Sequence, residues 1–257
     1  MSVADHEQLV PLPASGRLFT ATRRVRLGDA SPGGRLRLDS CVRYLQDVAN
    51  DDSRDAGSPN PTAWVARRTV LRVERFPEYL DMLTMHTWCG GLGPRWAERR
   101  TSIVLDGSAT GARIEAATLW VHVDMETMKQ VSVPVDFAEQ FGEAAAGRAI
   151  SARLHLPTRP GPATVHTTVW PLRFVDFDVL GHMNNAVYWS IVEEQLARVR
   201  RVRAPLTVTL DHHDAIDPDP EPGGVVQVAV ADTERGFDLW VTTSAGRVAA
   251  VARAVID

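Results

Sequence analysis

The spacing of apolar residues changes along this chain, and each change marks an expected element. Leu38, Val42, Leu45 and Ala49 recur at helical spacing, which predicts a helix with one buried stripe. Asp39 or Ser40 is the expected cap of this helix. Runs of β-branched and aromatic residues, typical of strands, occupy 19–27, 64–76, 83–88, 96–105 and 114–125. The first half is therefore predicted to contain a strand, a turn, a helix and then several strands, in that order.

The second half repeats this order. Residues 163–177 are strand-like, 178–181 read as a turn, and 185–201 carry the stripe Tyr188, Val192, Leu196 and Val199 of a second helix. Further strands are predicted at 206–213, 225–231, 237–243 and 247–256. The same order returning after about 140 residues indicates an internal duplication.

A helix followed directly by antiparallel strands can bury its stripe in the concave face of a curled sheet, which is an α+β arrangement of the hot-dog type. Two such units cover each other's exposed sheet edges. We therefore predict a tandem (double) hot-dog fold. Its parts are a loose arm at 1–16, a first unit at 17–137, a linker with at most one helical turn at 138–162, and a second unit at 163–257.

Composition narrows the class of protein. The 257 residues are 44% hydrophobic, and the formal charge is −4, so a folded core is expected and a general basic field for nucleic acid is not. Two cysteines far apart, Cys41 and Cys89, cannot build a disulfide framework and are expected to be buried apolar residues. No apolar run is long enough for a membrane span and no signal peptide is recognisable, so a cytoplasmic protein is expected.

Candidate chemistry is concentrated where the second helix begins. Gly181 at a helix mouth leaves backbone N–H groups unsatisfied beside the positive end of the helix dipole. A carbonyl oxygen that gains negative charge during ester hydrolysis would be stabilised there. The amide of Gly181 or His182 is the candidate oxyanion donor. Asp178 is the candidate carboxylate, either activating water or attacking directly.

The neighbouring residues have less certain roles. His182 can bind the carbonyl oxygen, orient water or pack at the helix mouth. Asn184 and Asn185 suit helix capping as well as catalysis or substrate binding. Tyr188 and Trp189 are expected on the stripe and in the pocket lining rather than in the chemistry.

The run from Asp178 to Tyr188, D-x-x-G-H-x-N-N-x-x-Y, resembles the signature of hot-dog thioesterases. Together with the duplication, it is similar to the acyl-acyl-carrier-protein thioesterases of fatty acid biosynthesis, over about residues 17–257. The resemblance implies hydrolysis of acyl carrier protein thioesters to free fatty acids, without cofactor or metal. It also implies a first half that forms the acyl pocket and sets chain-length preference.

One position departs from the family. Plant-type members carry asparagine where this chain has Leu180, and leucine cannot hydrogen-bond. Leu180 is therefore expected only to contact substrate. The change keeps hydrolysis by Asp178 and the helix start, but it weakens the expectation of carrier-protein specificity.

Family members also place a polar residue on a strand some thirty residues after the histidine. Asp211, His212, His213 and Asp214 occupy that region here. On a strand, Asp211 and His213 share one face and His212 and Asp214 the other, with His213 the preferred support for Asp178. Adjacent histidines on a strand point apart, which disfavours a metal site.

The first half offers candidates for an acyl pocket and a docking surface. Its bulky apolar residues suit a tunnel wall, Trp64 foremost, with Met82, Met85, Trp88 and Trp120. Two interpretations are open for a group of arginines: a cationic patch for an acidic carrier protein or for coenzyme A phosphates, or solvated faces and complements to a helix C-terminal dipole. The group consists of Arg67, Arg68, Arg99, Arg100, Arg198, Arg200, Arg201 and Arg203.

Three other functions remain open at this stage. An acyl-CoA thioesterase would use the same site. An enoyl-thioester hydratase or dehydratase would need a different proton-transfer pair from the one seen between 178 and 185. A non-catalytic acyl- or carrier-binding protein is the third, and Leu180 is the best argument for it. Monomer and homodimer are both compatible with the sequence.

Overall fold

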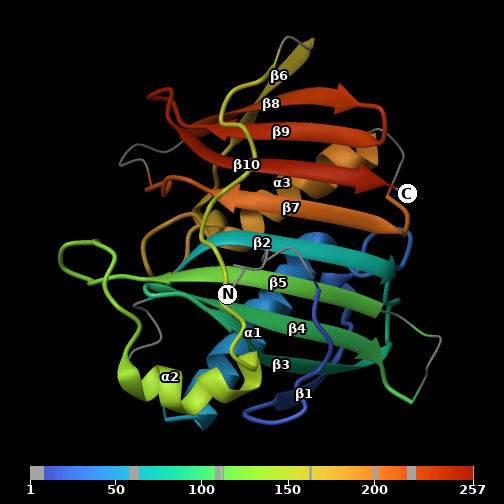
Figure 1. Ribbon diagram of the computed structural model, residues 1–257. Coiled ribbons are helices and arrows are strands. Elements are labelled where there is room, and N and C mark those ends of the chain that lie inside the picture. The colour runs from blue at the N-terminus through green and yellow to red at the C-terminus, as the bar shows by residue number, and fades with distance from the viewer. Residues whose placement is uncertain are drawn as a thin grey trace.

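One ten-stranded antiparallel sheet with two long helices against one face makes up most of the molecule (Figure 1). The computed structural model describes residues 9–57, 64–107, 111, 113–161, 164–198, 202–218 and 224–256. The helices are α1 (Leu38–Asp55) and α3 (Asn185–Arg198). The strands are β1 (Phe19–Arg24), β2 (Trp64–Arg75), β3 (Met82–Leu92), β4 (Trp96–Leu105), β5 (Arg113–His122), β6 (Val165–Pro171), β7 (Leu206–His212), β8 (Val225–Thr233), β9 (Gly236–Thr242) and β10 (Val248–Ile256).

The two halves of the sheet repeat one topology. From the central pair outwards, the order is β2-β5-β4-β3-β1 on one side and β7-β10-β9-β8-β6 on the other. The central strands β2 and β7 are antiparallel, which relates the halves by an approximate two-fold axis between them. The predicted duplication and double arrangement are confirmed.

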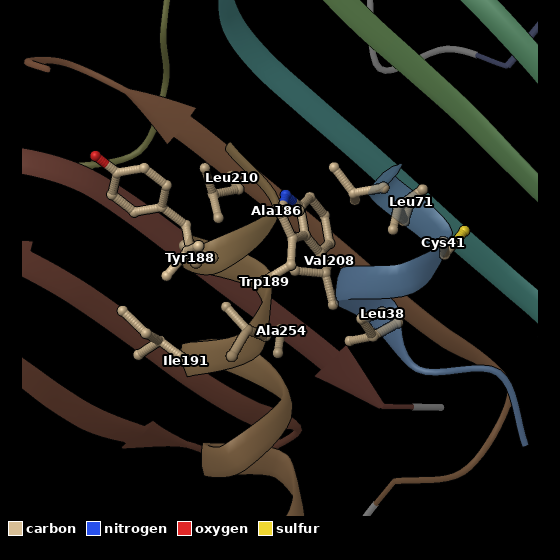
Figure 2. Packing of buried hydrophobic residues seen from close by; sticks show 14 of the residues in the cluster. Leu38, Cys41, Leu71, Ala186, Tyr188, Trp189, Ile191, Val208, Leu210 and Ala254 are labelled. Atoms are coloured by element: carbon tan, nitrogen blue, oxygen red, sulfur yellow. The ribbon is translucent and has the colours of Figure 1, made fainter. Parts of the chain in front are cut away.

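The main core lies between the sheet and the helices and runs through both halves. Trp189 of α3 is fully buried on the side facing α1, beside Leu38 and Cys41, while the Tyr188 ring points away from α1 (Figure 2). Because one core spans both helices, the halves share their packing.

The connection between the halves is more ordered than predicted. Helix α2 (Val135–Phe141) and a 3-10 turn (Gly142–Ala145) come first. The chain then crosses the sheet face opposite α1 and α3 (Figure 1). Two indoles hold it there, the Trp96 Nε1 donating to the Ile150 carbonyl at 2.9 Å and the Trp240 Nε1 to the Pro157 carbonyl at 2.7 Å. The segment joins both half-sheets, which is why it is not a loose linker.

A buried ion pair joins the two half-sheets at their seam. Arg68 of β2 and Asp211 of β7 are directly opposite in register, and both side chains have no exposed surface. The Arg68 Nη2 lies 2.8 Å from Asp211 Oδ2, which also accepts a hydrogen bond from the Leu156 amide at 3.3 Å. Asp211 therefore ties together both halves and the connecting segment.

The predicted start of the first helix is wrong in one detail. α1 begins at Leu38, so Asp39 and Ser40 lie inside the first turn and cannot cap it. The preceding Arg37 makes no side-chain cap hydrogen bond. The first amide of α1 is instead satisfied by a distant carboxylate, that of Glu193 in α3.

Candidate active site

The turn before α3 is held by backbone hydrogen bonds and one buried carboxylate. Asp176 closes a short 3-10 turn (Phe174–Asp176) and accepts from the Arg173 amide at 2.8 Å. The Asp178 amide donates to the His182 carbonyl at 3.1 Å, and the Gly181 amide donates to the Asp178 carbonyl at 3.0 Å. Gly181 has φ +78°, a left-handed conformation that favours glycine. These bonds bring Asp178 and His182 to the start of the helix.

The Asp178 carboxylate has a defined orientation. Its Oδ1 accepts from the Leu180 amide at 2.9 Å, and its Oδ2 accepts from the Asn184 Nδ2, also at 2.9 Å. The Asn184 Oδ1 accepts from the Ala186 amide at 2.9 Å. The Asn184 side chain thus both caps α3 and orients Asp178. Its predicted role in helix capping is therefore compatible with a role in the candidate site.

His182 has a partner that the sequence did not reveal. Its Nδ1 lies 2.8 Å from the Asp217 Oδ1, and both side chains are largely exposed. This contact fixes the orientation of the ring and leaves Nε2 available for substrate or water. Asp217 lies 35 positions after the histidine and past β7, outside the run 211–214 in which the sequence predicted a supporting polar residue.

The structure does not bring His213 to this site. His213 lies with Arg159 and Trp240 on the sheet face crossed by the connecting segment. His212 faces the other way, with its ring edge-on to Tyr188 at a centroid distance of 5.2 Å. Burial lowers the pKa of His212 to about 3, so this ring is neutral at physiological pH. The prediction that His212 and His213 face opposite sides of the sheet was correct. The prediction that His213 supports Asp178 was wrong, because His213 lies on the face opposite the helices.

The first half contains a second copy of the same turn. Ser31, Gly34 and Arg35 stand where the second half has Asp178, Gly181 and His182, each three to seven residues before its helix. The Ser31 amide donates to the Arg35 carbonyl at 2.8 Å and the Gly34 amide to the Ser31 carbonyl at 2.9 Å, matching the bonds of the later copy. The backbone is repeated, whereas the candidate catalytic side chains are not.

This copy indicates which amide of the second turn can hold an oxyanion. In the first half, the Leu38 amide donates to the Glu193 Oε2 at 3.1 Å, so a negatively charged oxygen sits at the start of α1. The equivalent amide of α3 is that of Asn185, and no described residue accepts a hydrogen bond from it. The Gly181 amide is already used within its turn, which leaves the amides of His182 and Asn185 as donor candidates. The contact at the Leu38 amide favours Asn185.

The remaining predicted contacts divide between surface and core. Leu180 is 55% exposed beside Asp178, and Asn185 is half-buried at the helix start. Trp189 is 0% exposed between the helices and is a core residue, which corrects its prediction as a substrate contact. Tyr188 is buried against His212, and both burial and the charge of Asp214 raise the pKa of its hydroxyl.

A largely apolar pocket lies in the first half, between the second half of α1 and the sheet. The cavity has a volume of about 70 Å³ and is partly open to solvent. Trp64 and Trp120 line it from the sheet, and α2 covers it with Phe137 and Phe141. Of the five predicted pocket residues, these two tryptophans line it, while Met85 belongs to the main core.

The predicted cationic patch is wrong for the arginines that the structure buries. Arg68 and Arg100 have at most 1% exposed surface, and Arg99 pairs with Asp52 of α1. Arg200 and Arg201 lie outside the described residues. Arg68, Arg99 and Arg100 therefore stabilise the fold rather than presenting positive charge to a binding partner.

Two further expectations concern cysteines and metals. Cys41 and Cys89 are buried free thiols, and burial raises the pKa of Cys41 to about 12. Among the described residues, no three His, Cys, Asp or Glu side chains gather as a metal site would require. Within the same part of the chain, no helix has the length and apolarity needed to cross a bilayer.

Comparison with known proteins agrees with this architecture. A family model described as the acyl-ACP thioesterase N-terminal domain matches residues 16–141, and the corresponding C-terminal domain matches 163–255. An uncharacterised protein of Mycobacterium tuberculosis H37Rv is 33% identical over 81% of this chain and 82% of its own length. Oleoyl-acyl carrier protein thioesterase of Coriandrum sativum is 23% identical over 84% of this chain and 66% of its own.

Solved structures show the same fold. The 12:0-ACP thioesterase from Umbellularia californica superimposes with a TM-score of 0.74 at 18% identity, covering 93% of this chain and 96% of that one. An acyl-ACP thioesterase from Bacteroides thetaiotaomicron gives a TM-score of 0.72 at 15% identity, covering 93% and 98%. The fold is therefore that of a double hot-dog protein, and the family matches place it in the thioesterase class. The chain belongs to the acyl-ACP thioesterase family.

Proposed function

We propose that this protein hydrolyses the thioester of a fatty acyl chain on acyl carrier protein, releasing the free fatty acid. The observation that carries this proposal is the Asp178 carboxylate, held at the start of α3 by Asn184 and the Leu180 amide. Family membership supports the carrier protein as the thiol component. No step requires a cofactor or a metal.

The reaction can be written with this chain's groups. A water oxygen attacks the carbonyl carbon while Asp178 takes a water proton, and the carbonyl oxygen becomes an oxyanion. The Asn185 amide, at the positive end of α3, stabilises that oxyanion. The C–S bond then breaks, and the departing thiolate takes up the proton. Direct attack by Asp178, through an anhydride that water then opens, uses the same geometry.

His182 assists at the edge of this site. Asp217 orients its ring through Nδ1, and the free Nε2 can position water or bind the carbonyl oxygen. The Leu180 side chain has no hydrogen-bonding group, so the water has its polar partners in Asp178 and His182. The site therefore works without the asparagine of the plant-type enzymes.

The acyl chain is assigned to the pocket of the first half. Its walls are mainly apolar, and Trp64 packs against Phe137 with tilted rings at a centroid distance of 4.6 Å. Closure by α2 limits the length of chain that fits. The first half thus binds the chain, and the second half performs the chemistry.

A hydrolysis panel tests this function. Acyl carrier protein and coenzyme A thioesters with the same acyl chains are incubated with wild type, Asp178→Asn and Ser31→Ala. Ser31 is the matched control, because it occupies the position of Asp178 in the inactive copy of the turn. We expect Asp178→Asn to lower kcat at least about 100-fold and Ser31→Ala to leave it within about twofold of wild type.

The outcomes separate the alternatives. Turnover of coenzyme A thioesters alone would make the protein an acyl-CoA thioesterase. Binding of acyl carrier protein without turnover would make it a non-catalytic binding protein. Full activity in Asp178→Asn would reject the assignment of the site.

A further inference from the structure

The approximate two-fold axis allows a contact seen in one half to locate its counterpart in the other. Leu38 and Asn185 are the first residues of α1 and α3, and Gln46 and Glu193 are the ninth. A two-fold axis between antiparallel β2 and β7 exchanges the two helices. A contact between the ninth residue of α3 and the start of α1 therefore places the ninth residue of α1 at the start of α3.

Such a contact exists at the start of α1. The Glu193 Oε2 accepts a hydrogen bond from the Leu38 amide at 3.1 Å, and its carboxylate also pairs with Arg35. Arg35 stands at the position of His182 in the repeated turn. Glu193 thus fills the anion-binding position of the first half and closes it.

Gln46 is the counterpart of Glu193 in the half that carries Asp178. It is half-buried, and no described residue makes a hydrogen bond with its side chain. One turn further along α1, Ala49, Asn50 and Ser53 line the apolar pocket. The approximate two-fold symmetry therefore places Gln46 between the turn at Asp178 and the pocket assigned to the acyl chain.

Building on the proposed function, we propose that Gln46 is a further catalytic residue, contributed by the first half to the site of the second. Its side-chain N–H donates a hydrogen bond to the thioester carbonyl oxygen, together with the Asn185 amide. The carboxamide has the shape of the glutamate side chain but carries no charge and offers two donors. A carboxamide at this position stabilises the oxyanion by donating a hydrogen bond, whereas a carboxylate would repel it.

The contrast between the halves follows from this single difference in charge. A carboxylate is attracted to the positive end of a helix and occupies it permanently, as Glu193 does. A neutral amide leaves the position open for substrate. The anion-binding position at the start of α1 is therefore filled, whereas the equivalent position at the start of α3 is open to substrate.

Three variants and two readouts test the proposal. Gln46→Ala removes the donor, and Gln46→Glu reproduces the arrangement of the first half with an isosteric side chain. Glu193→Gln is the matched control, since it makes the converse change at the start of α1, where no catalysis is expected. Each variant is assayed for kcat and KM, and a crystal structure of Gln46→Glu locates the new carboxylate. Thermal unfolding checks that each variant is folded.

We expect Gln46→Ala to lower kcat about 10- to 100-fold with KM changed less than about threefold, because the lost bond forms mainly in the transition state. Gln46→Glu is expected to lower kcat at least about 100-fold, with its carboxylate bound to the Asn185 amide. Glu193→Gln is expected to keep the wild-type kcat.

Two results would overturn the proposal: a Gln46→Ala kcat equal to that of wild type, or a Gln46→Glu carboxylate placed away from the Asn185 amide. A wild-type protein without any thioesterase activity would instead reject the proposed function. In that case a carboxylate found at the Asn185 amide would still support the placement of Gln46, so the two failures are distinguishable.

Discussion

Acid should destabilise this protein through one buried histidine. His212 has 8% exposed surface, its ring packs edge-on against Tyr188, and its Nε2 has no hydrogen-bond partner among the described residues. Burial lowers the pKa of His212 from 6.5 to about 3 in the folded protein. In the unfolded chain, the ring takes up its proton at the ordinary value.

The sign and size of the effect follow from proton linkage. Below pH 6.5 the unfolded state binds a proton at His212 that the folded state does not bind until about pH 3, so stability is lost as the pH falls through that window. Each pH unit is worth about 1.4 kcal/mol. Two units below the unfolded pKa, the loss amounts to about 2.5 kcal/mol, for any folded pKa under about 4.

The assay is urea unfolding followed by tryptophan fluorescence at pH 7.5 and pH 4.5, for wild type and His212→Phe. Phenylalanine keeps the aromatic contact with Tyr188 but cannot titrate. Groups that titrate in both proteins cancel in the comparison. We expect wild type to lose about 2.5 kcal/mol more than the variant between the two pH values. Equal losses would show that His212 takes up its proton without unfolding, and the reasoning would be wrong.

Three further predictions follow from the fold and the turn. Asp211→Asn should lower the free energy of unfolding by about 3–5 kcal/mol, because it removes the negative charge opposite the buried Arg68 guanidinium, and urea unfolding measures this. Gly181→Ala and Gly34→Ala should each cost about 1 kcal/mol, because both glycines have positive φ, but only the former should lower kcat; equal kcat values would contradict the role of the second turn. Asp217→Asn should lower kcat about tenfold by releasing the His182 ring, and an unchanged kcat would make the contact incidental.

The repeated turn indicates why the candidate site belongs to the second half and not to the first. Both copies keep the same backbone hydrogen bonds and a glycine with positive φ before the helix. Ser31 and Arg35 in the first copy cannot replace Asp178 and His182, and Glu193 fills the helix start that would otherwise bind an oxygen. Conserving the backbone of the turn stabilises both halves, while the chemistry needs only one set of side chains.

Local pattern in the sequence was enough to predict much of this protein. The helix that begins at Leu38 and the one at Asn185 followed from apolar periodicity, and strand β4 was predicted at both of its ends. Asp178, His182 and Asn184 were predicted from the resemblance of residues 178–188 to the hot-dog thioesterase signature, and a tight turn with Gly181 brings them together. Such features depend on short-range geometry, which neighbouring residues encode directly.

Only the tertiary structure decided which distant groups meet. Alternation on a strand shows that His212 and His213 face opposite ways, but the packing of α3 decides which of them faces the helices. The pairing of Asp217 with His182 and that of Glu193 with the start of α1 join residues 35 and 155 positions apart. Such contacts depend on strand register and on how the helices pack, and these are set by the whole core rather than by any short segment.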